Sequence, residues 1–215
     1  MATKRIVVLI SGSGSNLQAL IDATASGRID GRIVAVISNR PGVLGLERAQ
    51  KAGIRAELLD HKAFDSREAF DSALQALIDS HEPDLVVLAG FMRILTTEFV
   101  SHYLGRMFNI HPSLLPRYKG LNTHQRALEA GDTEHGCTVH FVTPELDGGP
   151  LVVQAVVPVA TDDDASRLQQ RVHECEHRIY PLAVEWFCAD RLQLLQEGVT
   201  LDGALLPPTG YRLDA

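Results

Sequence analysis

The first half of the chain alternates short apolar runs with longer amphipathic segments, and this rhythm restricts the fold more than any other feature. The short runs predict strands at Ile6–Ile10, Ile33–Ile37, Arg55–Leu59 and Leu85–Leu88. The segments between them predict helices at Leu17–Ser26, Leu46–Ala52 and Arg67–Ser80. Strands that alternate with helices pair in parallel through right-handed crossovers, and helices then cover both faces of the sheet. We therefore expect the chain to begin as a parallel α/β sheet.

The rhythm changes after a further short helix and strand, which are predicted at Thr97–Tyr103 and Met107–Ile110. The segment Pro112–Asn122 is loop-like, because prolines and a glycine interrupt any regular pattern. The sequence then predicts a helix at Thr123–Ala130, strands at Cys137–Val142 and Leu151–Val159, and a long helix near Asp164–Asp190. The turn TPELDGG joins the two strands, which predicts an antiparallel pair. The tail from Gly198 is expected to form a short hairpin and coil.

The predicted architecture is a single α/β domain with one open twisted sheet. The sheet is parallel and Rossmann-like in the N-terminal half and mixed or antiparallel in the C-terminal half. In such sheets, ligands bind beyond the carboxyl ends of the strands. We expect four segments to converge there: Ser11–Asn16, Gly90–Ile94, Asn109–His111 and Asp147.

Composition excludes several classes of protein. The chain has 215 residues, 45% of them apolar, which suffices for a substantial core. Its net charge of -7 argues against general nucleic-acid binding but not against a local phosphate pocket. The apolar run Ile6–Ile10 is too short for a signal peptide or a membrane span, so we expect a soluble cytoplasmic protein. The sequence does not distinguish a monomer from a homodimer. Cys137, Cys175 and Cys188 lack the spacing of a disulfide framework or a zinc site, and are expected to be buried free thiols.

The motif SGSGSN occupies Ser11–Asn16, directly after the first predicted strand. Its glycines let the backbone approach a ligand closely, and the amides of a helix N-terminus attract an anion. The motif is neither a dinucleotide fingerprint nor a P-loop, so it favours the phosphate of a mononucleotide. The alternative is a tight turn in which Ser15 or Asn16 is the helix N-cap.

The motif AGFMRIL covers Ala89–Leu95, after the fourth predicted strand. A backbone run at a strand end can hydrogen-bond a flat heterocycle between apolar walls. Those walls would come from Phe91, Met92, Ile94 and Leu95. The alternative is a buried turn that leads into the next helix.

An asparagine and a histidine stand at the end of the fifth predicted strand, in NIHPSLLPRYKG. Asn109 and His111 are two residues apart, so on a strand their side chains point to the same side. Pro112 then ends the strand, because it lacks a ladder donor. Asp147, in the TPELDGGP turn, is a carboxylate that can orient an imidazole and favour its charged form. The alternatives are a structural histidine and an aspartate that only caps its turn.

The segment HECEHRIYP lies on the long predicted helix. Glu176 and Tyr180 share a face there at i and i+4, and from spacing alone an ordinary solvated helix face explains them. The remaining histidines do not have the spacing of a metal-ligand set, so we expect no bound metal.

Six segments of the chain occur in the order and spacing seen in one enzyme family: VVLISGSGSN, VVLAGFMRIL, NIHPSLLP, HGCTVHFV, ELDGGP and EHRIYP. NIHPSLLP with a downstream DGGP is shared by folate-dependent formyltransferases. SGSGSN, AFDSREAF, GFMRIL and EHRIYP are typical of the glycinamide ribonucleotide transformylases. Over essentially its whole length, the chain resembles that family.

The resemblance implies transfer of a formyl group from the co-substrate 10-formyltetrahydrofolate to the amine of glycinamide ribonucleotide, in de novo purine biosynthesis. The amine would attack the formyl carbon directly. Asn109 and protonated His111 would stabilise the resulting oxyanion, and Asp147 would orient His111. The reaction needs neither a metal nor a covalent enzyme intermediate.

The resemblance also implies two binding sets. The ribonucleotide phosphate would be held by Gly14, Ser15, Asn16, His173 and Glu176, although some relatives are expected to carry an amide side chain at His173. The folate would be held by Arg67, Met92, Arg93, Ile94, Leu95, Thr143, Pro144, Glu145, Leu146 and Asp147.

By the same resemblance, residues 1–105 of the domain 1–215 would be a mononucleotide-binding half, residues 106–190 a catalytic and folate-binding half, and residues 191–215 a C-terminal tail. A cis Leu115–Pro116 bond is expected as well. The loop from Ser113 to Glu134 is long enough to move and to close over the substrate.

Three alternatives compete with this hypothesis. Formyltetrahydrofolate deformylases carry an extra N-terminal regulatory domain, which we do not expect because the first strand begins at Arg5. Transfer-RNA formyltransferases usually carry a C-terminal nucleic-acid-binding domain, which we do not expect either. A non-catalytic nucleotide-binding protein on the same fold would need a broken trio, whereas Asn109, His111 and Asp147 are all present.

Overall fold

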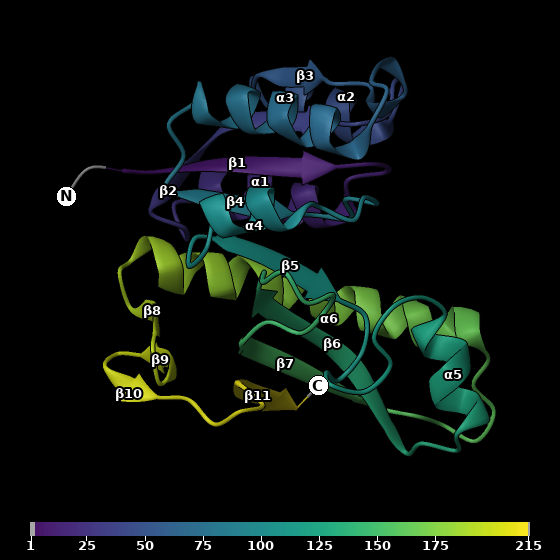
Figure 1. The fold of residues 1–215 in the computed structure, drawn as a ribbon. Helices are drawn as coiled ribbons and strands as arrows, with labels where there is room; N and C mark the ends of the chain where they lie inside the picture. Colours follow the sequence, from purple (N-terminus) through teal and green to yellow (C-terminus); the bar gives the residue numbers. More distant parts are fainter. Residues whose placement is uncertain (1–2, 215) are drawn as a thin grey trace. The chain divides into compact units, whose positions relative to one another are not determined.

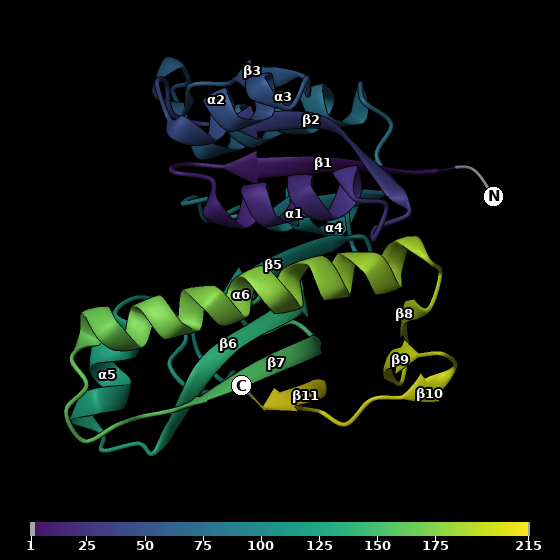
Figure 2. The ribbon, with the colours of Figure 1, turned by 180° about the vertical axis from the view of Figure 1, so that it is seen from behind.

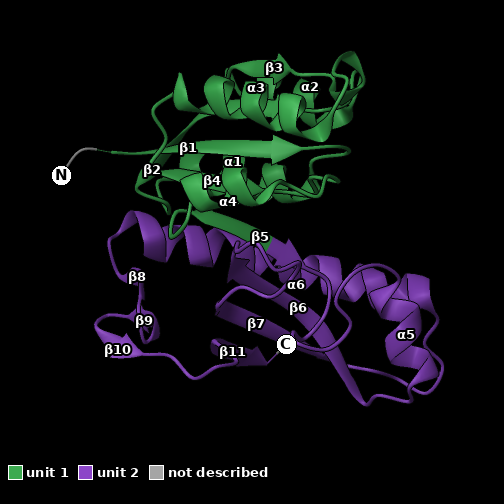
Figure 3. Ribbon diagram, in the orientation of Figure 1, with its two compact units in different colours: residues 1–109 green, residues 110–215 purple. Residues whose placement is uncertain are grey.

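A computed structural model of the protein describes residues 3–214. The chain divides into two compact units, residues 1–109 and residues 110–215, which are coloured separately in Figure 3. Each unit has its own set of strands and helices.

The first unit contains five parallel strands of an eight-stranded sheet, in the order β5-β4-β1-β2-β3. Its strands are β1 (Lys4–Ile10), β2 (Gly31–Ser38), β3 (Ala56–Leu58), β4 (Leu85–Leu88) and β5 (Met107–His111), the last of which runs into the second unit. Its helices are α1 (Ser15–Ala25), α2 (Leu44–Lys51), α3 (Arg67–Asp79) and α4 (Thr97–His102), with a short 3-10 turn, η1, at His61–Ala63. The predicted elements of this unit are confirmed to within a few residues at each end.

The helices of the first unit form two layers. Helices α1 and α2 pack side by side on one face of the sheet, and α3 and α4 pack side by side on the other (Figures 1 and 2). The side chains of β4 and of residues 6–10 of β1 are therefore buried on both faces. This double cover explains why these strands are continuous apolar runs rather than alternating ones.

The second unit is built on the antiparallel strands β6 (Glu134–Phe141) and β7 (Leu151–Pro158). Helix α6 (Ala165–Cys188) packs on both strands and also contacts α5 (Thr123–Glu129). The antiparallel pair and both helices are as predicted. The cis peptide bond between Leu115 and Pro116 is also confirmed.

The prediction for the C-terminal tail is wrong in part. Strands β8 (Leu192–Leu195), β9 (Gly198–Leu201) and β10 (Ala204–Leu205) form a small antiparallel sheet, so the hairpin begins before Gly198. The expected coil instead contains β11 (Tyr211–Asp214), which pairs in parallel with β7. A four-residue strand is stabilised mainly by backbone hydrogen bonds to a distant edge strand, and its own sequence carries little signal of that pairing.

The mixed α/β fold class is confirmed, with parallel strands first and mixed pairing later. None of the helices within residues 3–214 is both long enough and apolar enough to cross a bilayer. Cys137, Cys175 and Cys188 are buried free thiols, as expected.

Candidate active site

The β1–α1 loop carries the motif SGSGSN and packs tightly on the start of α2. Gly14 adopts the left-handed region with φ 73°, and a Cβ atom there would lie 2.7 Å from the Cα atom of Gly45. The carbonyl of Gly12 accepts a hydrogen bond from the backbone N–H of Gly45 at 3.1 Å. Two separate constraints therefore require glycine at position 14.

The alternative in which Ser15 or Asn16 is the N-cap of α1 is wrong, because the helix begins at Ser15 and its N-cap is Gly14. Among the described residues, no side chain caps this end. The positive end of the helix dipole therefore points out of this turn, where it favours an anion.

Arg48 is a feature of this loop that sequence analysis missed. Its Nε atom donates to the carbonyl of Ser13 at 2.8 Å, and its guanidinium also reaches the side-chain oxygen of Gln18 at 3.3 Å. A positive charge therefore lies beside the glycine-rich loop. Neither contact is encoded by sequence spacing, since Arg48 belongs to the next helix, α2.

A buried polar network joins this loop to the segment after β4. The Ser11 hydroxyl donates to Asn39 Oδ1 at 2.5 Å and accepts from the backbone N–H of Met92 at 2.8 Å. The backbone carbonyl oxygen of Asn39 in turn lies 3.0 Å from His61 Nδ1. The structure thus brings together two of the four segments that were expected to converge. Asn39 and His61 were not predicted as part of this network.

The segment Ala89–Leu95 is only partly buried. Ala89 and Phe91 are buried, whereas Met92 and Ile94 are 57% and 63% exposed. The interpretation as a plain buried turn therefore does not fit, because two large apolar side chains in one short loop face solvent. The next backbone N–H, that of Thr96, donates at 2.6 Å to the buried carboxylate of Asp71, which anchors the end of the loop.

Two arginines stand near the start of α3. The Arg93 guanidinium lies 5.1 Å from the ring centroid of Phe70, a cation–π distance. Arg67 is the first residue of α3, and its Nε atom is 4.0 Å from Glu68 Oε1. Its side chain is 47% exposed, so it is accessible to a ligand.

The side chains of His111 and Asp147 meet in the second unit. His111 Nδ1 lies 3.5 Å from Asp147 Oδ1, and both side chains are 8% exposed. His111 Nε2 is 2.8 Å from the carbonyl oxygen of Tyr118, and the Gly120 backbone N–H donates to Asp147 Oδ2 at 2.9 Å. Asn109 precedes His111 by two residues on β5, so their side chains leave the strand on the same side.

The DGGP turn has a backbone that only this type of sequence tolerates. Asp147 adopts φ 48°, a conformation that aspartate tolerates better than most residues. A Cβ atom at Gly149 would clash with the carbonyl oxygen of Phe141. The turn is therefore tight against β6, and this places the Asp147 carboxylate at the imidazole.

The rest of the turn, residues 143–146, is more exposed. Pro144 and Glu145 face solvent, and Leu146 is 56% exposed. Glu145 Oε1 pairs with Lys119 Nζ at 2.7 Å, which ties this turn to the loop after β5.

The interpretation of HECEHRIYP as a solvated helix face is wrong for two of its residues. Glu176 is 5% exposed and Tyr180 is fully buried, because this face of α6 packs against β6 and β7. Burial, with the nearby Glu176 carboxylate, raises the pKa of Tyr180 well above its usual value. His173, one turn before Glu176, is partly exposed.

Two further histidines, His124 and His135, lie near His111 and contact each other. His124 Nδ1 and His135 Nε2 are 3.1 Å apart. Burial first, and then the neighbouring His173, lowers the pKa of His124 to about 4. Burial first, and then His124, lowers the pKa of His135 to about 4. Both imidazoles are therefore neutral at pH 7, and one donates to the other.

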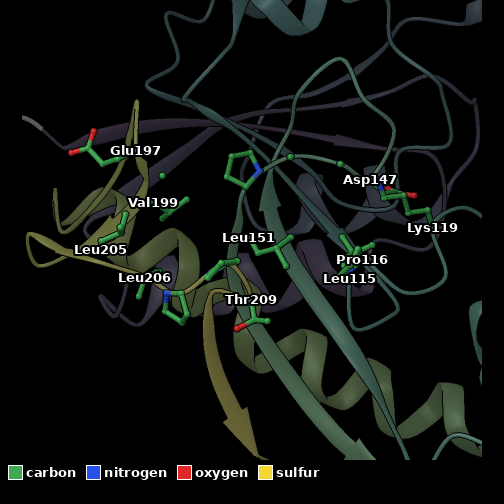
Figure 4. Close-up of a pocket in the computed structure, with 16 residues that line it drawn as sticks. Leu115, Pro116, Lys119, Asp147, Leu151, Glu197, Val199, Leu205, Leu206 and Thr209 are labelled. Carbon is green, nitrogen blue, oxygen red and sulfur yellow. The ribbon is translucent and has the colours of Figure 1, made fainter.

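A cavity of about 550 Å³ borders the DGGP turn (Figure 4). Its walls are mainly apolar side chains: Leu115, Pro116, Leu151, Val199 and Leu206. Figure 4 shows Asp147 and Lys119 at one end of it and Glu197 at the other. Asp147 thus lies at the edge of a mainly apolar cavity as well as beside His111. Within residues 3–214, no group of three or more His, Cys, Asp or Glu side chains is placed to bind a metal ion.

Comparison with known proteins identifies relatives along nearly the whole chain. The sequence profile of the formyl transferase family matches residues 4–184. A phosphoribosylglycinamide formyltransferase of Escherichia coli (strain K12) is 57% identical over 209 residues, 97% of this chain and 99% of that protein. The human trifunctional purine biosynthetic protein adenosine-3 is 47% identical over 194 residues, 90% of this chain and 19% of that protein. The structure of a phosphoribosylglycinamide formyltransferase from Coxiella burnetii aligns with a TM-score of 0.95 at 53% identity, over 99% of this chain and 100% of that one.

Proposed function

The chain belongs to the formyl transferase family, among the phosphoribosylglycinamide formyltransferases, and we propose that it transfers the formyl group of 10-formyltetrahydrofolate to the amine of glycinamide ribonucleotide. The products are formylglycinamide ribonucleotide and tetrahydrofolate, in purine biosynthesis. We place this reaction in the cytoplasm.

The observation that carries the catalytic assignment is the buried pair of His111 and Asp147. The two residues are far apart in the sequence, yet their side chains lie 3.5 Å apart with little exposure. A structural histidine needs only hydrogen-bond partners, whereas an imidazole held by a carboxylate at a strand end is the arrangement that acyl transfer uses. Asn109 on the same side of β5 adds an amide donor.

The reaction assigns one role to each member of the trio. The substrate amine attacks the formyl carbon, and the formyl oxygen becomes an oxyanion that accepts hydrogen bonds from the Asn109 amide and protonated His111. The Asp147 carboxylate holds His111 in place and orders a water molecule. That water carries the proton lost by the amine to the folate nitrogen, whose bond to the formyl carbon then breaks. The proton lost and the proton gained balance, so no metal or covalent enzyme intermediate is needed.

The ribonucleotide phosphate is assigned to the start of α1. Gly14 is the N-cap of this helix and Ser15 and Asn16 are its first residues, so the positive end of the helix dipole lies at these three positions and favours an anion. Arg48 adds a positive charge beside the loop. His173 and Glu176 on α6 are proposed as the remaining contacts of the ribonucleotide.

The folate is assigned to exposed apolar side chains and to polar side chains near them in the sequence. Met92, Ile94 and Leu146 are large apolar residues that face solvent, as expected for walls that a heterocycle completes. The other proposed folate contacts are Arg67, Arg93, Leu95, Thr143, Pro144, Glu145 and Asp147. We assign residues 1–105 to a mononucleotide-binding half, residues 106–190 to a catalytic and folate-binding half, and residues 191–215 to a C-terminal tail.

A coupled assay tests this proposal. Pure protein is mixed with 10-formyltetrahydrofolate, with and without glycinamide ribonucleotide, and tetrahydrofolate formation is followed. We expect turnover only with the ribonucleotide, its loss in His111→Ala, and its retention in the matched control His102→Ala, whose side chain is exposed. Equal turnover without the ribonucleotide would identify a hydrolase, and no turnover at all would leave a binding protein.

A further inference from the structure

A short piece of loop contacts both members of the His111–Asp147 pair. The carbonyl of Tyr118 lies 2.8 Å from His111 Nε2, and the N–H of Gly120 donates to Asp147 Oδ2 at 2.9 Å. The pair itself meets through the two other atoms, His111 Nδ1 and Asp147 Oδ1. In each side chain, the atom that does not face the partner side chain contacts a backbone group of the loop.

The donor and acceptor inventory determines where the imidazole protons are. A carbonyl oxygen only accepts, so the Nε2 atom that faces Tyr118 must carry a hydrogen. The Nδ1 atom faces a carboxylate, which also only accepts when it is ionised. Its distance of 3.5 Å exceeds a normal hydrogen bond, so the Nδ1 position is not saturated by Asp147.

We propose that residues Tyr118–Gly120 form a backbone clasp that holds His111 through Nε2 and turns its Nδ1 atom toward the substrate, and that Tyr118, Arg126 and Asp132 are positioning residues of this clasp. The inference rests on the proposed function, in which His111 donates to the formyl oxygen. With Nε2 engaged by the Tyr118 carbonyl, Nδ1–H is the donor left for that oxygen.

Three side chains hold the clasp in shape. Tyr118 adopts φ 54°, which costs energy for a residue with a large side chain. Its phenol donates to Asp132 Oδ2 at 2.7 Å, and the Arg126 guanidinium lies 5.2 Å from its ring centroid. Arg126 also donates to the carbonyls of Lys119 at 2.7 Å and Leu121 at 3.2 Å. These hydrogen bonds hold the backbone of the loop on both sides of Gly120.

The base of the same loop is fixed to the sheet of the second unit. The Thr138 hydroxyl donates to the carbonyl of Ser113 at 2.7 Å, and Gln154 Nε2 donates to the carbonyl of Leu115 at 2.8 Å. Thr138 and Gln154 are both buried. The loop is thus anchored before Tyr118, and the clasp depends on its own side chains beyond that point.

Other titratable groups near His111 do not obscure a measurement on it. They are Asp147, His124, His135, His140 and Lys119. Burial lowers the pKa of all three histidines in this set, so they are neutral near neutral pH. Lys119 is paired with Glu145.

The test compares two variants with two matched controls. Tyr118→Phe removes the hydrogen bond to Asp132 but keeps the ring, and Arg126→Gln removes the grip on the loop carbonyls. Tyr211→Phe and Arg212→Gln make the same chemical changes on β11, where both side chains are exposed. For each protein, kcat, both KM values and the 15N resonances of the His111 ring are measured. The His111 resonances are assigned from their absence in His111→Ala.

We expect kcat to fall roughly tenfold in both test variants, as for the loss of one or two hydrogen bonds that position a reacting group, with each KM within about twofold. The neutral His111 ring of the wild type should be the Nε2–H tautomer, and both test variants should show a mixture of tautomers. The two controls should match the wild type.

Either of two results would contradict the proposed role of the clasp. One is unchanged kcat and unchanged His111 resonances in both test variants, and the other is a fall in kcat without any change in those resonances. If the wild type does not formylate glycinamide ribonucleotide, the proposed function fails, whereas the resonances still decide whether the clasp exists. Circular dichroism of each variant identifies misfolded protein, and the two variants remove different hydrogen bonds of the clasp.

Discussion

The hydroxyl of Ser11 donates to Asn39 Oδ1 at 2.5 Å, and both side chains are almost completely buried. The same hydroxyl accepts from the backbone N–H of Met92. One serine therefore connects the ends of two neighbouring strands to the loop that is proposed to bind the folate. The interaction is costly to remove, because each group would lose its partner inside the core.

Replacing Ser11 by alanine should therefore loosen the Met92 loop. We expect the free energy of unfolding to fall by about 1–3 kcal/mol, the cost of unsatisfied buried groups. The KM for the formyl donor should rise severalfold, while that for the ribonucleotide changes less. Urea unfolding and steady-state kinetics measure both. The exposed Ser72→Ala is the matched control, and equal effects of the two changes would contradict this role.

Gly14→Ala should disrupt the β1–α1 loop more than an ordinary glycine change. Gly27→Ala is the control, because Gly27 has a similar φ of 78° and a methyl group added there would have nothing within 4 Å. The positive φ costs an alanine about 1–2 kcal/mol at either position. The contact with Gly45 adds about 1–3 kcal/mol at Gly14 alone. Thermal unfolding should separate the two variants, and only Gly14→Ala should raise the KM for the ribonucleotide.

The buried histidine pair predicts a loss of stability in weak acid. Burial lowers the pKa of His135 to about 4 from 6.5, so below pH 6.5 the unfolded chain binds a proton that the folded chain does not. Stability is fully present above pH 6.5 and is lost as the pH falls toward 4, by up to about 3 kcal/mol for this group.

Urea unfolding of the wild type and of His135→Gln between these pH values measures this loss. The variant should be less stable at pH 7 but should depend less on pH. His102→Gln, with an exposed ring, is the control. A wild-type curve that is flat over this range would show that His135 is not buried in the neutral form.

Gln154 should be important for both stability and rate. Its amide donates to Leu115 O and to Thr138 Oγ1, so Gln154→Met keeps the volume but leaves the buried carbonyl of Leu115 without this donor. We expect a loss of about 1–3 kcal/mol in unfolding free energy. A smaller fall in kcat should follow, because the loop that leads to Tyr118 starts there. The exposed Gln169→Met is the control, and equal stability of the two variants would refute the anchor.

Local patterns predicted most of the elements because the forces that form them are local. The βα rhythm of the first unit, the antiparallel pair at TPELDGG and the long helix α6 were all readable from apolar spacing and turn residues. The N-cap at Gly14 and the strand Tyr211–Asp214 were not readable. The first depends on close packing against Gly45, and the second on a backbone pairing with β7.

The sequence by itself determined the fold class, the family and the identity of the proposed catalytic trio, since these depend on residue types in order along the chain. Only the tertiary structure decided that Asp147 reaches His111, because this requires the tight turn after β6 and the left-handed backbone of Asp147. The contact between the Tyr118 carbonyl and His111 likewise could not be predicted from the sequence. It is made by a carbonyl group, which every residue carries, and its position depends on how the loop folds rather than on which residue supplies it.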